Sequence, residues 1–222
     1  MMYKCLVLDH DDTVVDSTAS IHFPCFVEYL TKYRPHLAAS YTTESYFLKN
    51  FSPGIVSLLR DEVGLSAEEL HHEEEYWREY VSSHVPRAYD GIREVCQRFV
   101  DEGGILAVSS HSFTSYIERD YRANSLPTPH RIFGWDSSPE RRKPAPYALY
   151  ELMREYKLDP CEILVVDDLK PGLDMARDAG VDFAASGWSY DIPEIEHFMR
   201  ENCKYYLKTV KELETLLFGG AK

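Results

Sequence analysis

Five short apolar segments, rich in Val, Ile, Leu and Phe, constrain the fold of this chain most strongly. They lack the alternation of polar and apolar residues, and each ends in polar or small residues: Tyr3–Asp9, Gly104–Ser110, Arg131–Asp136, Glu162–Asp168 and Asp182–Trp188. Segments of this length and composition are typical of strands that are buried on both faces of a parallel sheet. The sequence therefore predicts a parallel sheet that is covered on both sides.

Helix-like segments lie between and after these strands, and they are clearest at Ile92–Glu102, Ala145–Leu158, Gly172–Ala179 and Val210–Phe218. Glycine follows the first and third of them, and Pro160 follows the second, as is common just beyond a helix end. Strands that alternate with helices imply right-handed crossovers. We therefore predict an α/β fold, with a Rossmann-like open parallel sheet and helices on both of its faces.

Residues 17–85 interrupt this alternation, because they carry helical patterns and no convincing strand. Helices are expected at His22–Tyr33, Tyr41–Asn50, Ile55–Glu62 and Ala67–Val81. Ser66 and Glu69 have the spacing of a capping box at the start of the last one. We predict a small all-helical domain at residues 17–85, inserted after the first strand, and an α/β core formed by residues 1–16 and 86–222.

The chain is strongly acidic: 24 Lys and Arg against 37 Asp and Glu give a formal net charge of −13. The resulting field repels phosphate backbones and anionic lipid, so neither nucleic acid nor a membrane surface is an expected partner. No segment has the pattern of a signal peptide or a membrane span, and the five cysteines include no CxxC pair. We expect a cytoplasmic protein with reduced thiols, and a monomer, since no coiled-coil stripe is present.

Carboxylates concentrate where two of the predicted strands end. Asp9 and Asp11 follow the first strand, and Asp167 and Asp168 end the fourth. Ligands of open α/β sheets gather at the carboxyl ends of the strands, so these groups should meet in one crevice. Such a cluster is costly without a hard cation, and Mg²⁺ prefers a site of few carboxylates. Asp9 alone would more often belong to a solvated acidic turn, so the argument depends on both pairs.

Four short motifs lie on the predicted strand ends, in this order: Asp-His-Asp-Asp-Thr-Val at 9–14, Ser109, Lys143 in Lys-Pro-Ala-Pro, and Asp167-Asp168. Together they resemble the motifs of the haloacid dehalogenase superfamily, the aspartate-nucleophile phosphotransferases, and the resemblance covers nearly all of the core. Two positions differ from the common pattern. Asp12 stands where glycine is frequent, and Asp167 stands where the fourth motif often has glycine.

The resemblance implies a role for each carboxylate. Asp9 would attack phosphorus and become an aspartyl-phosphate, while Asp11 would protonate the leaving oxygen and then activate water. Mg²⁺ is the implied cofactor, bound by Asp9, by the backbone carbonyl of Asp11 and by Asp168. Whether Asp167 also binds the metal stays open.

The resemblance also implies roles for neutral and cationic residues. Ser109, Ser110 and Lys143 would bind the oxygens of the transferred phosphoryl group, because this reaction depends on positioning and on charge stabilisation. Thr13 and Asp12 would support the loop that follows the first strand. Taken alone, Ser109 and Lys143 would more often be an ordinary strand-end serine and a surface lysine.

The inserted domain resembles the helical cap that many members of this superfamily carry at this position. The segment just after the first motif, with His22, Phe23 and Phe26, is the expected place for contacts that select the substrate. For each of these residues, packing inside the helical domain is the simpler interpretation.

The resemblance implies an enzyme, namely a Mg²⁺-dependent phosphomonoester hydrolase that acts on a small phosphorylated metabolite. Two alternatives stay open. A phosphomutase of the β-phosphoglucomutase type would use the same core and return the phosphoryl group to a sugar. A catalytically silent binding member of the superfamily would usually have lost one of the motif acids, whereas all are present here.

Overall fold

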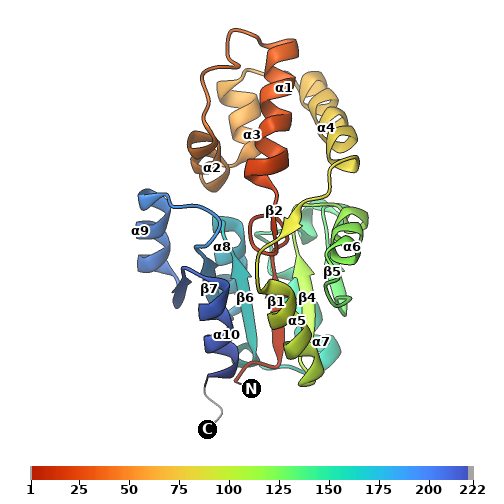
Figure 1. Cartoon of the computed structure of the whole chain (residues 1–222), viewed down its shortest axis with the longest axis vertical. Helices are drawn as coiled ribbons and strands as arrows, with labels where there is room; N and C mark the ends of the chain where they lie inside the picture. Colours follow the sequence, from red (N-terminus) through yellow and green to blue (C-terminus); the bar gives the residue numbers. More distant parts are fainter. Residues whose placement is uncertain (1, 220–222) are drawn as a thin grey trace. The chain divides into compact units, whose positions relative to one another are not determined.

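The computed structural model describes residues 2–219, which fall into two compact units (Figure 1). One unit contains the chain up to Asp16 and from Arg87 onward, and the other is Ser17–Pro86. No helix of the described residues is long and apolar enough to cross a membrane. We call the two units the core and the insert.

The core is built on a parallel sheet whose strand order is β5-β4-β1-β6-β7-β8. β1 (Cys5–Leu8) lies between β4 (Ile105–Ser109) and β6 (Ile163–Asp167), and the outer strands are β5 (Arg131–Phe133), β7 (Asp182–Ser186) and β8 (Tyr205–Leu207). From β1 the chain first builds one side of the sheet and then crosses to the other. The chain therefore continues from β1 toward β4, and from the neighbouring β6 toward β7, in opposite directions along the sheet. Open α/β sheets bind ligands beside the point where the direction changes.

The helices of the core are α5 (Ile92–Asp101), α6 (Thr114–Ala123), α7 (Tyr147–Tyr156), α8 (Lys170–Ala179), α9 (Pro193–Asn202) and α10 (Val210–Phe218). Short 3-10 turns lie at Pro139–Arg141 and Pro160–Glu162. In Figure 1, α5 and α10 lie in front of the sheet, and α7 and α8 lie behind it. The predicted α/β class, with helices on both faces of a parallel sheet, is confirmed.

Several predicted boundaries are wrong. All five strands are shorter than expected, and the third one ends at Phe133 instead of Asp136. α7 begins at Tyr147 instead of Ala145, directly after Pro146, and ends where Lys157 adopts a left-handed φ of 55°. α8 begins two residues early, at Lys170, because Pro171 suits the first turn of a helix.

The elements of the core that were not predicted include α6, α9 and β8. The two helices are mostly polar and bury only small stripes at i, i+4 spacing, such as Ile117 with Tyr121 and Ile195 with Met199. β8 is a three-residue strand at the edge of the sheet. These elements are stabilised by packing on the sheet, which a local sequence pattern does not reveal.

Alternate residues of the central strands face one side of the sheet, where the main hydrophobic cluster forms. Leu6 and Leu8 of β1 pack there with residues of the neighbouring strands and with apolar residues of α5, α6 and α10: Leu106, Val108, Leu164, Val166, Ile92, Phe99, Ile117 and Leu213. This rigid packing fixes the carboxyl ends of β1, β4 and β6, from which the candidate site is built.

The insert consists of α1 (Phe23–Tyr33), α2 (Thr43–Phe51), α3 (Ile55–Ser57) and α4 (Ala67–Ser82), with π-helical segments at Thr18–His22 and Leu58–Glu62. The capping box of Ser66 and Glu69 forms as predicted, and Thr42 with Ser45 makes a second one. Phe26, Leu30 and Leu58 lie in the hydrophobic centre of the insert. Its helices thus bury a core of their own.

A short antiparallel pair, β2 (Val15–Asp16) with β3 (Arg87–Ala88), lies in the core where the chain leaves for the insert and returns. This pair was not predicted. The amide of Tyr89 also donates to the carbonyl of Val14 at 3.0 Å. The two crossing segments are therefore held together within the core, directly after the first motif.

Candidate active site

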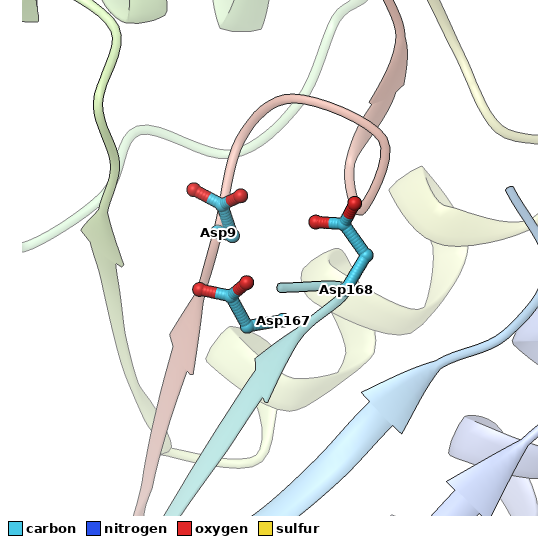
Figure 2. Close-up of side chains that lie close together, drawn as sticks. All are labelled: Asp9, Asp167 and Asp168. Carbon is cyan, nitrogen blue, oxygen red and sulfur yellow. The ribbon is translucent and has the colours of Figure 1, made fainter. Parts of the chain in front are cut away.

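Three carboxylates converge at the carboxyl ends of β1 and β6, as Figure 2 shows. Asp9 follows β1, Asp167 is the last residue of β6 and Asp168 follows it. One ligand oxygen of each lies within 4.8 Å of the others. Their side chains are buried, with relative exposures of 5% for Asp9, 1% for Asp167 and 4% for Asp168. The two acidic motifs therefore meet in space.

Lys143 supplies positive charge to this cluster. Its Nζ lies 2.9 Å from Asp9 Oδ1 and 2.5 Å from Asp167 Oδ2, and the whole side chain is buried. Burial opposes the charged form of Lys143, but the carboxylates of Asp167 and Asp9 outweigh it and raise the pKa of the ammonium group. Lys143 therefore stays protonated and sets its positive charge against the carboxylate of Asp9.

His111 lies beside Lys143 but adds no second charge. Its Nε2 is 3.1 Å from the carbonyl oxygen of Lys143, and its ring meets the Trp135 ring edge-on. Burial, reinforced by the charge of Lys143, lowers the pKa of His111 to about 4. At neutral pH the imidazole is uncharged, so its Nε2–H donates to that carbonyl.

Asp168 carries the feature that points most directly to a cation. Its Oδ1 is buried and has no hydrogen-bond partner among residues 2–219. Its other oxygen, Oδ2, accepts a hydrogen bond of 3.2 Å from the hydroxyl of Tyr190. Burial raises the pKa of Asp168 well above its usual range, and the neighbouring charges of Asp12 and Asp167 raise it further.

The residues present fit a divalent cation. An unpartnered carboxylate oxygen in a cluster of three buried acids is costly, and Lys143 balances only part of the charge. All three donors are hard oxygen ligands, which suit Mg²⁺ or Ca²⁺ better than softer metals. The next acid along the chain, Asp174, instead pairs with Arg177 on the surface of α8.

Gly172 leaves the space that Asp167 needs. A Cβ atom at this position would lie 2.2 Å from Asp167 Oδ2, the same oxygen that accepts from Lys143. The other oxygen of Asp167 accepts from the amide of Leu169 at 2.8 Å. A side chain at position 172 would therefore displace the carboxylate that pairs with Lys143.

The loop after β1 has a conformation that explains its sequence. Asp12 has a φ of 55°, in the left-handed region that Gly, Asn and Asp tolerate best. Its amide donates to the carbonyl of Val15 at 2.8 Å, and its carbonyl accepts from the hydroxyl of Ser189. The hydroxyl of Thr13 lies 2.7 Å from that of Ser186 at the end of β7. Asp12 and Thr13 thus contribute to a tight turn.

His10 ties the same loop to α6. Its Nε2 lies 3.0 Å from Asp120 Oδ2, and Arg119 Nε donates to the other oxygen of Asp120 at 2.8 Å. Both His10 and Asp120 are buried. Sequence reasoning missed this pair, because α6 was not predicted and the two residues are more than a hundred positions apart.

Three serines lie on the β4 side of the site, at the second motif and just after it. Ser109 and Ser110 are buried at the end of β4. The hydroxyl of Ser109 lies 3.7 Å from Met175 Sδ, and that of Ser110 accepts from the amide of Ser112 at 3.1 Å. The hydroxyl of Ser112 donates to Asp11 Oδ2. Ser112 and Tyr190 are the other site residues that the sequence did not reveal, since neither belongs to a motif.

The predicted specificity residues pack within the insert. His22 Nδ1 accepts from Trp77 Nε1 at 3.0 Å, and the ring of Phe23 lies 5.6 Å from that of Tyr46. Phe26 is almost completely buried, against Tyr41 and Tyr46. His22 and Phe23 keep partial exposure. Contacts inside the insert therefore account for most of the surface of Phe26.

Comparison with known proteins defines the class. Residues 6–186 match the sequence model of the haloacid dehalogenase-like hydrolase family, and the chain belongs to that family. The resemblance seen in the four motifs is thereby confirmed, and with it the expectation of an enzyme that is a hydrolase of this superfamily. No curated protein matches the chain.

Solved structures share the fold. A protein described as a predicted phosphoglycolate phosphatase from Haemophilus somnus superposes with a TM-score of 0.76 and 18% identity, covering 98% of this chain and 99% of that one. A haloacid dehalogenase-like hydrolase from Streptococcus pneumoniae gives 0.74 and 17%, covering 97% and 99%. CbbY from Rhodobacter sphaeroides, solved with xylulose-(1,5)bisphosphate, gives 0.69 and 22%, covering 96% of each chain. At these identities the likeness establishes the common fold.

Proposed function

We propose that this protein is a Mg²⁺-dependent phosphomonoester hydrolase that acts on a small phosphorylated metabolite. The observation that carries the proposal is the buried cluster of Asp9, Asp167 and Asp168, with Lys143 bridging two of the three acids. The names of the structural neighbours support the substrate class, since one is described as a phosphoglycolate phosphatase and another was solved with a sugar bisphosphate.

Asp9 is the proposed nucleophile. The ammonium group of Lys143 lies against its carboxylate and balances part of its charge, and burial at the end of β1 keeps it rigid. One oxygen of Asp9 forms a bond to phosphorus in line with the ester oxygen, and the bond from phosphorus to that oxygen breaks. Asp11 delivers a proton to the departing oxygen and afterwards takes one from the water that hydrolyses the aspartyl-phosphate.

The remaining groups bind and orient the phosphoryl group. Lys143 would pair with a phosphoryl oxygen, and Ser109 and Ser110 lie at the adjacent end of β4. Asp9, Asp168 and the backbone carbonyl of Asp11 would hold Mg²⁺, with Asp167 beside them. When bound, this ion supplies charge that stabilises the phosphoryl oxygens.

We also propose that the insert, residues 17–85, selects the substrate. His22 and Phe23 are the better candidates, because Phe26 is almost fully committed to packing. Replacing His22 by Ala should change the order of preference among phosphorylated substrates. An unchanged order, together with unchanged folding, would contradict this role.

Phosphate release from a panel of phosphorylated metabolites tests the activity. The purified protein is assayed with Mg²⁺ and with excess chelator, and the Asp9→Asn variant serves as the control for contaminating phosphatases. Release that needs both Mg²⁺ and Asp9 is expected. A transfer of phosphate to another position of the sugar, with no release, would favour a mutase. No turnover of any kind in a folded, Mg²⁺-binding sample would favour a binding role.

A further inference from the structure

The hydroxyl of Ser112 makes a short contact with the carboxylate of Asp11. Ser112 Oγ donates to Asp11 Oδ2 at 2.5 Å, across more than a hundred positions in the sequence. Ser112 is 3% exposed, whereas Asp11 is only partly buried. A buried donor thus contacts the more accessible carboxylate of the first motif.

The backbone around Ser112 is fixed by its neighbours. Its amide donates to Ser110 Oγ at 3.1 Å, and its carbonyl accepts from the amide of Trp135 at 2.8 Å. The amide of Ser110 in turn donates to the carbonyl of Phe133, the last residue of β5, at 3.0 Å. The segment between β4 and α6 is therefore tied to the end of β5, and the hydroxyl of Ser112 is held in place from both sides.

We propose that Ser112 is a positioning residue for Asp11 in the phosphoryl transfer, an inference that rests on the proposed function. Ser112 restricts the rotation of the Asp11 side chain and keeps its carboxyl group aimed at the leaving oxygen. In that step the bond from Asp9 to phosphorus forms, the ester bond breaks, and the proton of the Asp11 carboxyl moves to the leaving oxygen. Because a misplacement of about 1 Å can cost about 100-fold in rate, a single hydrogen bond to the acid matters.

The inference makes a specific prediction about the leaving group. An alkyl phosphate releases a strongly basic alkoxide, so it depends on the proton from Asp11. p-Nitrophenyl phosphate releases a weakly basic phenolate and depends on this proton much less. Loss of the Ser112 hydroxyl should therefore impair the first substrate far more than the second.

The experiment compares kcat/KM of the wild-type protein and Ser112→Ala for the best alkyl phosphate and for p-nitrophenyl phosphate. We use kcat/KM because it reports the steps up to formation of the aspartyl-phosphate, in which Asp11 acts as the acid. The variant should lose about 10- to 100-fold with the alkyl phosphate and less than about threefold with p-nitrophenyl phosphate. Ser112→Cys keeps the volume but is a weak donor, so it should show the same selective loss. It replaces Ser112→Ala in the comparison if that variant folds poorly.

Ser186→Ala is the matched control. Ser186 is also a buried serine whose hydroxyl contacts the loop after β1, but it bonds to Thr13 and not to a carboxylate. Its removal should change kcat/KM for both substrates by the same factor. An equal loss for both substrates in the Ser112 variants, or no loss in either, would overturn the inference alone. A wild-type protein that hydrolyses neither substrate would overturn the proposed function, and the inference with it.

Discussion

The core and the insert differ in where their charged side chains lie. In the core, the side chains that are buried together at the carboxyl ends of β1 and β6 include four charged ones: Asp9, Asp167, Asp168 and Lys143. In the insert, the buried residues are mainly aliphatic and aromatic. Three of its five Lys and Arg side chains instead pair with nearby carboxylates at or near the surface: Arg34 with Glu69, Lys49 with Glu62, and Arg60 with Asp61.

This difference indicates where the chemistry lies. Burial of several carboxylates is unfavourable unless cations compensate for it, so a fold tolerates such a cluster where function requires it. Surface ion pairs such as Lys49 with Glu62 contribute little to stability, and they leave few cations in the insert to bind an anion. We therefore propose that the phosphoryl chemistry belongs to the core alone, and four predictions test this division, beginning with the largest effect.

Replacement of the proposed nucleophile should abolish turnover. Asp9→Asn removes the attacking oxygen and one partner of Lys143, so phosphate release should fall by about 10⁴-fold or more. The matched control is Glu75→Gln, the same change at an exposed acid of the insert. It should leave the rate unchanged. A comparable rate in Asp9→Asn would contradict the mechanism.

A displacement of the Asp167 carboxylate should lower the rate less than the loss of Asp9. Gly172→Ala places a Cβ against Asp167 and should separate that carboxylate from Lys143, lowering kcat about 100-fold. Gly180→Ala is the control. Gly180 lies just beyond the end of the same helix and has a φ of 68°, and a Cβ added there would meet no atom within 4 Å. It should cost about 1 kcal/mol of stability and leave kcat unchanged. Equal activities of the two variants would show that Asp167 is not needed there.

Binding of the metal should stabilise the core. A cation at 100 times its Kd adds about 2.7 kcal/mol to the free energy of unfolding, which raises Tm by several degrees. Thermal unfolding with and without Mg²⁺ should show this rise in the wild-type protein and in Asp174→Asn, whose acid pairs on the surface. It should be absent in Asp168→Asn. A full rise in that variant would place the ion elsewhere.

An acid of the insert whose pKa is strongly raised, Glu73, gives the smallest effect. Glu73 is half-buried on α4, and burial, helped by the charge of Glu74, raises its pKa to about 7. Because the folded-state pKa of Glu73 lies above its ordinary value, the contribution of Glu73 to the free energy of unfolding is most favourable below about pH 4.5. That contribution is lost as pH rises through 7.

Glu73→Gln removes this penalty. At pH 8 the variant should be more stable than the wild-type protein by on the order of 2 kcal/mol, and at pH 4.5 the two should unfold alike. Urea unfolding at the two pH values measures this, and Glu75→Gln at an exposed site should show no such dependence. Greater stability of the variant at acidic pH would reverse the sign and refute the assignment.

Local pattern was sufficient for most of the fold. Continuous apolar runs identified β1, β4, β5, β6 and β7, because strands buried on both faces need apolar side chains at every position. The spacing of Ser66 and Glu69 predicted their capping box, since that motif is satisfied within four residues. α6, α9 and β8 escaped detection because their stability comes from packing on the sheet.

The sequence by itself determined the α/β class and the positions of the four motifs, which strand order then brings to one edge. Only the tertiary structure decided which atoms meet there: that Lys143 bridges Asp9 and Asp167, that His10 pairs with Asp120, and that Ser112 contacts Asp11. The physical reason is range. Periodicity and motifs report interactions within a few residues, whereas these contacts join side chains that only the packed sheet brings within hydrogen-bonding distance.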